Sequence, residues 1–96
     1  MNKERKEEFI SWKNELESRR QEILKRKAII VKKLTKYQLR LEIASSIEEE
    51  MKSTIYEELE KKVHLLKQEL EAFNTANDPQ LREIEVIVSK LQRQLI

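Results

Sequence analysis

Apolar residues recur every seven positions through the first half of this chain, and no other feature of the sequence limits the fold as strongly. The column comprises Phe9, Leu16, Ile23, Ile30, Tyr37, Ala44 and Met51. In the second half, apolar residues follow in alternating steps of three and four, at Tyr56, Leu59, Val63, Leu66, Leu70 and Phe73, and again at Leu81, Ile84, Val88, Leu91 and Leu95. These are the spacings of helical seams in coiled coils, so the chain is predicted to be all-α.

Such helices are interrupted at few places, because the 96 residues include no Gly and a single Pro. We expect one helical domain, residues 1–96, with helices over residues 3–43, 47–73 and 79–96. The stretch 74–78 is the clearest loop, since Asp78 is a favoured N-cap and Pro79 suits the first position of a helix. The third helix is therefore predicted to be the shortest.

The earlier break has three interpretations. Ser45 and Ser46 each precede a Glu by three positions, a capping-box pattern that favours a turn at Ser45-Ser46. A turn at Ser53-Thr54 is the second interpretation, and one uninterrupted helix through residue 73 is the third. Charge favours a break in this region, because residues 19–40 hold nine basic residues and one acid, whereas residues 42–60 hold seven acids and one base.

The same charge distribution indicates an antiparallel hairpin. Residues 1–44 carry 13 Lys and Arg against 7 Glu, while residues 45–73 carry 4 Lys against 8 Glu. If the chain reverses near residue 45, residue i faces roughly residue 91 − i. Lys33 then faces Glu58, and Arg20 faces Glu71. A basic first helix would thereby lie against an acidic second helix, and such charges determine register and orientation.

The expected helix lengths leave one end of the first helix uncovered. At ~1.5 Å per residue, the second helix returns only to about residue 18, and the third runs beside about residues 18–35. The third helix would cover the apolar run from Ala28 to Val31 and leave residues 1–17 as an overhang. The candidate anchors for a partner protein or a second copy are Phe9, Ile10, Trp12 and Leu16, with ordinary core residues as the alternative.

A second candidate surface is a basic stripe at seven-residue spacing. It comprises Arg19, Arg26, Lys33 and Arg40. Such a stripe can contact the phosphates of nucleic acid or anionic lipid. The alternative is a solvated face neutralised by the acidic helix. We favour this alternative, because Tyr37 is the only aromatic residue interleaved along the stripe and no winged or helix-turn-helix pattern is present.

The composition argues against an enzyme. Without Gly there is no phosphate-binding loop, and without Cys there is no thiolate zinc site, Cys nucleophile or disulfide. The single His, His64, has no third ligand at matching spacing. Clustered Glu residues on helix faces lack the partly dry pocket that separates the pKa values of a catalytic pair. We therefore expect no catalytic residue, no metal site and no cofactor.

Location and association can also be predicted. The longest apolar run has four residues, and no apolar stretch follows the basic N-terminus, so we expect a cytoplasmic protein without a membrane span. A fold of this size buries only about 60–65% of its unfolded surface, so self-association would stabilise it. The predicted architecture is a long antiparallel, coiled-coil-like helical hairpin plus a shorter third helix, self-associating as a homodimer.

The predicted function is a non-enzymatic protein–protein interaction module that acts through exposed coiled-coil seams. A small adaptor, an inhibitor or an assembly subunit would each fit this description. The alternative is a dimeric nucleic-acid-binding regulator that uses the basic stripe of residues 19–40.

Overall fold

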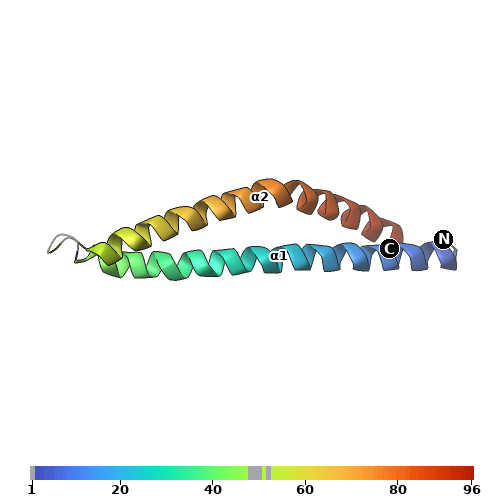
Figure 1. Ribbon diagram of the computed structural model, residues 1–96. Helices are drawn as coiled ribbons and strands as arrows, with labels where there is room; N and C mark the ends of the chain where they lie inside the picture. Colours follow the sequence, from blue (N-terminus) through green and yellow to red (C-terminus); the bar gives the residue numbers. More distant parts are fainter. Residues whose placement is uncertain (1, 48–50, 52) are drawn as a thin grey trace. The chain divides into compact units, whose positions relative to one another are not determined.

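Two long helices make up the fold in the computed structural model, which describes residues 2–47, 51 and 53–96. Helix α1 is Lys3–Ser45 and helix α2 is Thr54–Leu95 (Figure 1). The chain reverses between them, so the two helices run antiparallel. The predicted all-α class and the antiparallel helical hairpin are confirmed.

The chain folds as two compact units, each made of one segment of α1 and one segment of α2. Unit 1 comprises Met1–Lys25 and Thr75–Ile96, and unit 2 comprises Arg26–Asn74. The core of unit 2 is a cluster of Leu34, Val63 and Leu66, with Tyr37, Leu41 and Leu70 packed against it. The buried apolar residues of unit 1 are Leu16, Ile23, Ile84 and Leu91.

These buried residues belong to the predicted seams. Within the seven-residue column of α1, Leu16, Ile23, Ile30 and Ala44 are buried, and Phe9 and Tyr37 are half-buried. Met51 lies beyond the end of α1 and is exposed. Residues seven apart stand on one side of a helix, so the column forms the face of α1 that packs on α2.

Serine side chains mark both ends of the connection between the helices. The hydroxyls of Ser45 and Ser46 donate to the carbonyl oxygens of Glu42 and Ile43, at 2.7 and 2.6 Å. At the other end, the Oγ of Ser53 accepts the N–H of Tyr56 at 3.1 Å, which is the geometry of an N-cap. The chain thus leaves α1 at Ser45 and enters α2 at Thr54.

The connection between the two helices combines two of the predicted turns. Helix α1 ends at Ser45, as the Ser45-Ser46 interpretation requires, and α2 begins at Thr54, as the Ser53-Thr54 interpretation requires. An uninterrupted helix through residue 73 is wrong, and so is a second helix that starts at residue 47. The Glu partners of the capping boxes proposed for Ser45 and Ser46, Glu48 and Glu49, lie outside the described residues.

The predicted third helix is wrong, because α2 continues through residues 74–78, the expected loop, as far as Leu95. The physical reason is a column of residues at seven-residue spacing that continues across this stretch. It comprises Tyr56, Val63, Leu70, Asn77, Ile84 and Leu91, with Asn77 as its one polar member. A continuous helix keeps all six on one side, whereas a loop would interrupt the seam. Pro79 is accommodated inside the helix at the loss of one backbone hydrogen bond.

The predicted overhang of residues 1–17 is also wrong. Unit 1 places residues 75–96 of the continuous α2 with residues 1–25, so the N-terminal part of α1 has a partner. The third helix was expected to cover the run from Ala28 to Val31, but only Ile30 of that run is buried. The register between the helices also differs from the predicted one. Arg20 forms an ion pair with Glu85, whereas the predicted register placed it opposite Glu71.

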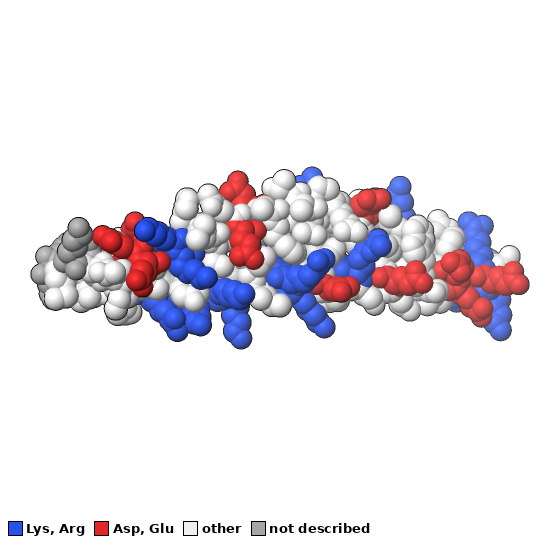
Figure 2. Space-filling model, in the orientation of Figure 1, with Lys and Arg blue, Asp and Glu red and all other residues white. Residues whose placement is uncertain are grey.

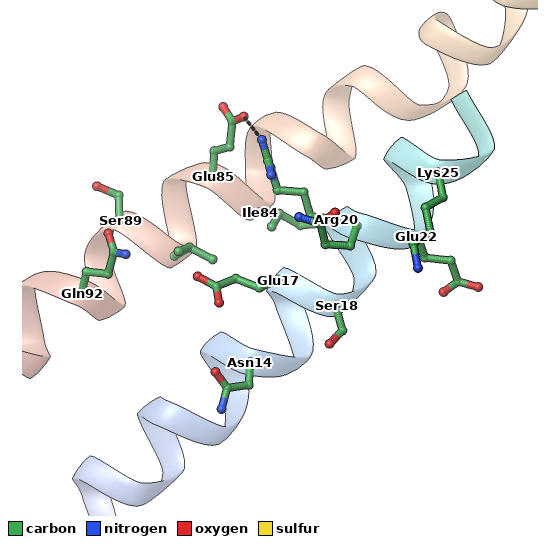
Figure 3. A pocket seen from close by; sticks show the side chains of 12 residues that line it. Asn14, Glu17, Ser18, Arg20, Glu22, Lys25, Ile84, Glu85, Ser89 and Gln92 are labelled. Carbon is green, nitrogen blue, oxygen red and sulfur yellow. Dashed lines mark ion pairs between the residues drawn. The ribbon is translucent and has the colours of Figure 1, made fainter. Parts of the chain in front are cut away.

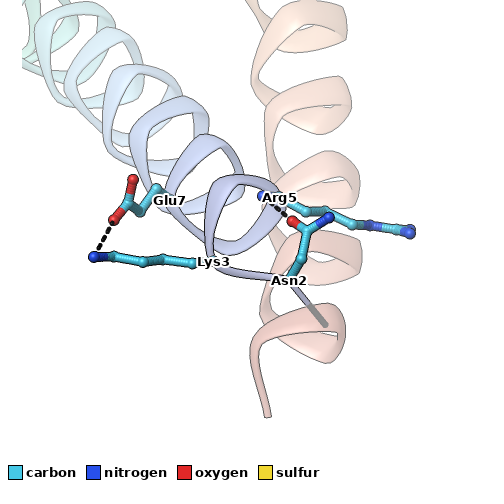
Figure 4. A network of polar contacts seen from close by, with 4 residues as sticks. All are labelled: Asn2, Lys3, Arg5 and Glu7. Atoms are coloured by element: carbon cyan, nitrogen blue, oxygen red, sulfur yellow. Dashed lines mark hydrogen bonds and ion pairs between the residues drawn. The ribbon is translucent and has the colours of Figure 1, made fainter.

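Helix α1 begins with a conventional cap. The side-chain Oδ1 of Asn2 accepts the N–H of Arg5 at 2.7 Å, and Lys3 lies 3.9 Å from Glu7 one turn further on (Figure 4). Asn is a favoured N-cap residue because its oxygen satisfies one of the unpaired N–H groups of the first turn. This cap explains why the helix starts at Lys3.

Candidate interaction surface

The four predicted anchors divide between the core and the surface. Leu16 is buried in unit 1, and Phe9 is half-buried beneath the guanidinium of Arg5, whose Cζ lies 5.4 Å from the ring centre. Ile10 and Trp12 remain exposed, and Trp12 retains 42% of its accessible surface. The candidate anchors that a partner can reach are therefore Ile10 and Trp12.

Trp12 stands at the edge of a small hollow in unit 1. The hollow measures about 380 Å³, and its other lining residues come from the last turns of α2: Ile87, Lys90, Leu91, Arg93 and Gln94. Trp is among the residues that most often dominate the energy of protein interfaces, because it combines a large apolar surface with a polar N–H. An exposed Trp beside a partly apolar hollow is a candidate contact site for a side chain of a partner.

A larger and more polar groove lies on unit 1. It encloses about 950 Å³, and α1 and α2 both line it (Figure 3). Some of its charges are engaged within the chain: Arg20 pairs with Glu85 at 3.9 Å, and Glu17 pairs with Lys13 at 3.1 Å. Glu22 and Lys25 also line the groove and take part in no ion pair among the described residues, so the groove retains one charge of each sign for a ligand.

Helix α1 carries a second apolar face that sequence reasoning missed. Ile29, Leu39 and Ile43 are 57%, 58% and 73% exposed, all within unit 2. Leu39 stands two residues from both Tyr37 and Leu41, which places it on the side of the helix away from the core. The available signal was the four-residue step from Leu39 to Ile43, outside the seven-residue column.

More apolar surface continues beyond the end of α1. Ile47, Met51 and Ile55 are exposed around the connection, and Met51 and Ile55 each keep more than half of their accessible surface. Single exposed apolar residues are ordinary, but many large exposed apolar residues on a small chain are typical of a protein that binds a partner. We call Trp12, Ile29, Leu39 and Ile43 the exposed apolar set of α1.

All four residues of the predicted basic stripe are exposed, and Figure 2 shows Lys and Arg side chains gathered along the α1 edge of unit 2. Within the part of the chain that the structure describes, none of Arg19, Arg26, Lys33 and Arg40 forms an ion pair. The neutralisation that we expected from the acidic segment is therefore not observed there.

A basic residue of α2, and not an acidic one, lies beside the stripe at Tyr37. Lys36 and Arg40 of α1 and Lys62 of α2 each lie 5.5 Å from the ring centre of Tyr37 in unit 2. Cations are attracted to the electron-rich face of an aromatic ring at such distances. Three cations of unit 2 therefore gather around one ring.

His64 is exposed on α2, and the described residues contain no group of three His, Asp or Glu side chains that could hold a metal ion. Neither α1 nor α2, over the residues described, has a stretch that is both long enough and apolar enough to cross a membrane.

Comparison with known proteins adds no assignment. No protein-family model matches the chain, and neither a curated protein nor a solved structure is significantly similar to it.

Proposed function

We propose that this protein is a non-enzymatic protein–protein interaction module that acts through helix α1, with a second copy of the chain as one partner. The observation that supports the proposal is the exposed apolar set of α1, which lies outside the seam with α2. An antiparallel helix pair uses one face of each helix. Additional large apolar residues on α1 are therefore available to another protein surface.

The charge pattern supports the same proposal. The cations of the stripe recur every seven residues beside the seam, which is the position that selects partners and orientation in coiled coils. Charges of this kind contribute to specificity and to the rate of association more than to affinity. Apolar residues of α1 would supply contact area, and the basic stripe would determine which partner binds.

Binding to nucleic acid is the second candidate function. It is favoured by one observation, the absence of ion pairs at Arg19, Arg26, Lys33 and Arg40 among the described residues. Duplex DNA would then bind with an affinity that falls steeply as salt is raised, and Arg26→Glu/Lys33→Glu would abolish that binding. Weak binding to generic duplex DNA at moderate salt would favour the protein-interaction proposal.

The primary proposal is tested by light scattering coupled to size exclusion, with the double variant Trp12→Ala/Ile29→Ser. The native chain is expected to self-associate at micromolar concentration, and the variant to shift towards the monomer. Trp12 and Ile29 are both exposed, so their replacement leaves the buried seam intact.

The matched control is Leu65→Ser/Val86→Ser, which removes two exposed apolar residues from α2 instead. It is expected to associate like the native chain. Equal loss of association in both variants would argue against a specific surface on α1, and a native chain that stays monomeric would contradict self-association.

A further inference from the structure

Three cations around one aromatic ring define a face of unit 2. Lys36 and Arg40 of α1 and Lys62 of α2 each lie 5.5 Å from the ring centre of Tyr37. All three basic side chains are exposed, and none of them forms an ion pair among the described residues. Because the cations come from both helices of the unit and reach one ring, they stand on the same side of it. We call this side the Tyr37 face.

Two exposed isoleucines belong to the Tyr37 face. Ile43 follows Lys36 by seven residues on α1, and Ile55 precedes Lys62 by seven residues on α2. Residues seven apart stand on one side of an α-helix, so each isoleucine shares the side of its lysine. Ile43 and Ile55 are 73% and 65% exposed. Since the helices are antiparallel, both isoleucines lie towards the connection, about 10.5 Å along each helix from the lysine.

The charge of this part of unit 2 is mainly positive. Residues 26–45 of α1 hold six Lys and Arg and a single acid, Glu42. On α2, Glu58 lies between Ile55 and Lys62 on the same side of the helix, because it is three residues from one and four from the other. Glu58 is exposed and forms no ion pair among the described residues. Three cations and one acid therefore give this part of the Tyr37 face a net positive charge.

A cationic centre beside a pair of apolar residues fits a particular kind of partner. We propose that the Tyr37 face binds an acidic amphipathic helix of another protein. Two carboxylates one turn apart on that helix would meet the cations, and an apolar residue two turns further on would meet Ile43 and Ile55. Binding of an amphipathic helix through a row of anchors is a common mode of recognition, and a third helix along an antiparallel pair forms a helical bundle.

Other occupants fit the Tyr37 face less well. A second copy centred on this face would bring three cations against the same three cations, so the second copy proposed above does not occupy it. Duplex nucleic acid would meet the cations but would leave the two isoleucines without a partner. An anionic membrane surface is wider than one helix and would also meet Glu57 and Glu60, which are exposed near the start of α2 and would repel it.

The probe for this inference is a synthetic helical peptide of alanine and glutamine. It carries two glutamates one turn apart, two leucines on the same side in the following turns, and a fluorescent dye at one end. The comparison peptide has lysine in place of both glutamates. In fluorescence anisotropy with the full chain, the acidic peptide is expected to bind, with an affinity that falls as salt is raised, and the lysine peptide is not.

Removal of two cations tests the centre of the face. Lys36→Gln/Lys62→Gln is expected to weaken binding of the acidic peptide at least about tenfold, because its carboxylates lose their partners. The matched control, Lys61→Gln/Lys67→Gln, makes the same charge change at two exposed residues of α2. These lysines are one and five residues from Lys62, which turns them to other sides of the helix. The control is expected to bind like the native chain.

Removal of the isoleucines tests the apolar part of the face. Ile43→Ser/Ile55→Ser is expected to weaken binding of the acidic peptide at least about tenfold, because the leucines of the peptide lose their apolar contact. The matched control is Val31→Ser/Val86→Ser, which changes an exposed valine five residues from Lys36 and another in unit 1. This control is expected to bind like the native chain.

Glu58→Gln provides a test in which affinity is gained. It removes the acid from the Tyr37 face, so binding of the acidic peptide is expected to strengthen about two- to fivefold. An unfolded variant could not bind more tightly, and circular dichroism establishes that each of the other variants remains helical. Equal or weaker binding by Glu58→Gln would contradict contact between the peptide and this face.

The inference rests on the proposed function, since it names the chemistry of a partner besides the second copy, and the failures of the two are distinguishable. If the chain self-associates but does not bind the acidic peptide, or if Lys36→Gln/Lys62→Gln binds it like the native chain, the inference is wrong and self-association survives. If a monomeric chain binds the peptide as expected, the inference stands and self-association is wrong.

Two further ligands test the class of partner in the same assay. They are vesicles of phosphatidylcholine and phosphatidylserine, and duplex DNA. Both are expected to bind more weakly than the acidic peptide at moderate salt. Tighter binding of either ligand, with the same loss in Lys36→Gln/Lys62→Gln, would overturn a protein helix as the occupant of the Tyr37 face.

Discussion

The guanidinium of Arg20 lies 3.9 Å from the carboxylate of Glu85, and this ion pair connects α1 to α2 within unit 1. It establishes which part of α2 lies beside the N-terminal part of α1. Both side chains are partly solvated, at 39% and 62% of their accessible surface, so the pair marks the register more than it stabilises the fold. Stability of unit 1 comes instead from the apolar residues of the seam.

The neighbouring residues Ile84 and Glu85 provide a direct comparison. Ile84→Ala is expected to lower the free energy of unfolding by about 2–4 kcal/mol, because Ile84 is buried at the seam. Glu85→Ala is expected to change it by less than about 1 kcal/mol. Urea unfolding followed by circular dichroism measures both. A larger loss for Glu85→Ala than for Ile84→Ala would contradict the assignment of the core.

Pro79 tests the continuity of α2. Inside a helix, proline removes a backbone hydrogen bond and clashes with the preceding turn, so Pro79→Ala is expected to raise the stability by about 1–3 kcal/mol. At the first position of a separate helix, the same substitution would be neutral or destabilising. Thermal unfolding of the two proteins separates the cases. A variant with a lower midpoint would support the loop at residues 74–78.

Among the serines of the connection, Ser53 is expected to contribute most to the free energy of unfolding. Its Oγ caps the first turn of α2 and the residue is buried, so Ser53→Ala is expected to cost about 1 kcal/mol. Ser46→Ala is the control, because the hydroxyl of Ser46 is exposed and donates to a nearby carbonyl at the end of α1. The two variants can be compared in urea, and equal stabilities would argue against the cap.

Asn74 carries a polar atom that weakens the seam. Its Oδ1 is buried and has no hydrogen-bond partner among the described residues, and such an atom costs about 1–3 kcal/mol. Asn74→Leu is therefore expected to stabilise the chain by about 1–2 kcal/mol, helped by the better helix propensity of Leu. Differential scanning calorimetry measures the change. An unchanged or lower midpoint would show that this oxygen has a partner.

Much of the fold could be predicted because the spacing of the apolar column of α1 is compatible with an α-helix and with no other secondary structure. Ile23 and Ile30 could only form one face of a helix, and they are buried as expected. The error at residues 74–78 arose from local signals: Asp78 and Pro79 favour a helix start in isolation, but the column from Leu70 to Ile84 favours continuation. The energy of an uninterrupted seam outweighs the cost of one proline.

The candidate surface was harder to predict, because exposure depends on register. Trp12 was expected to be exposed on an overhang, and it is exposed on the flank of a covered helix instead. Leu39 and Ile43 do not belong to the seam column, so their exposure could be seen only once the core was placed. Pairing between Lys33 and the acidic segment was expected from net charge, which does not specify which side chains meet.

We propose that α1 brings two copies of this chain together. Sedimentation equilibrium of the native protein over a range of concentration measures this self-association. We expect a mass approaching twice 11.6 kDa at micromolar concentration, falling towards 11.6 kDa on dilution. A mass of 11.6 kDa at every concentration, together with cooperative thermal unfolding of that monomer, would contradict it.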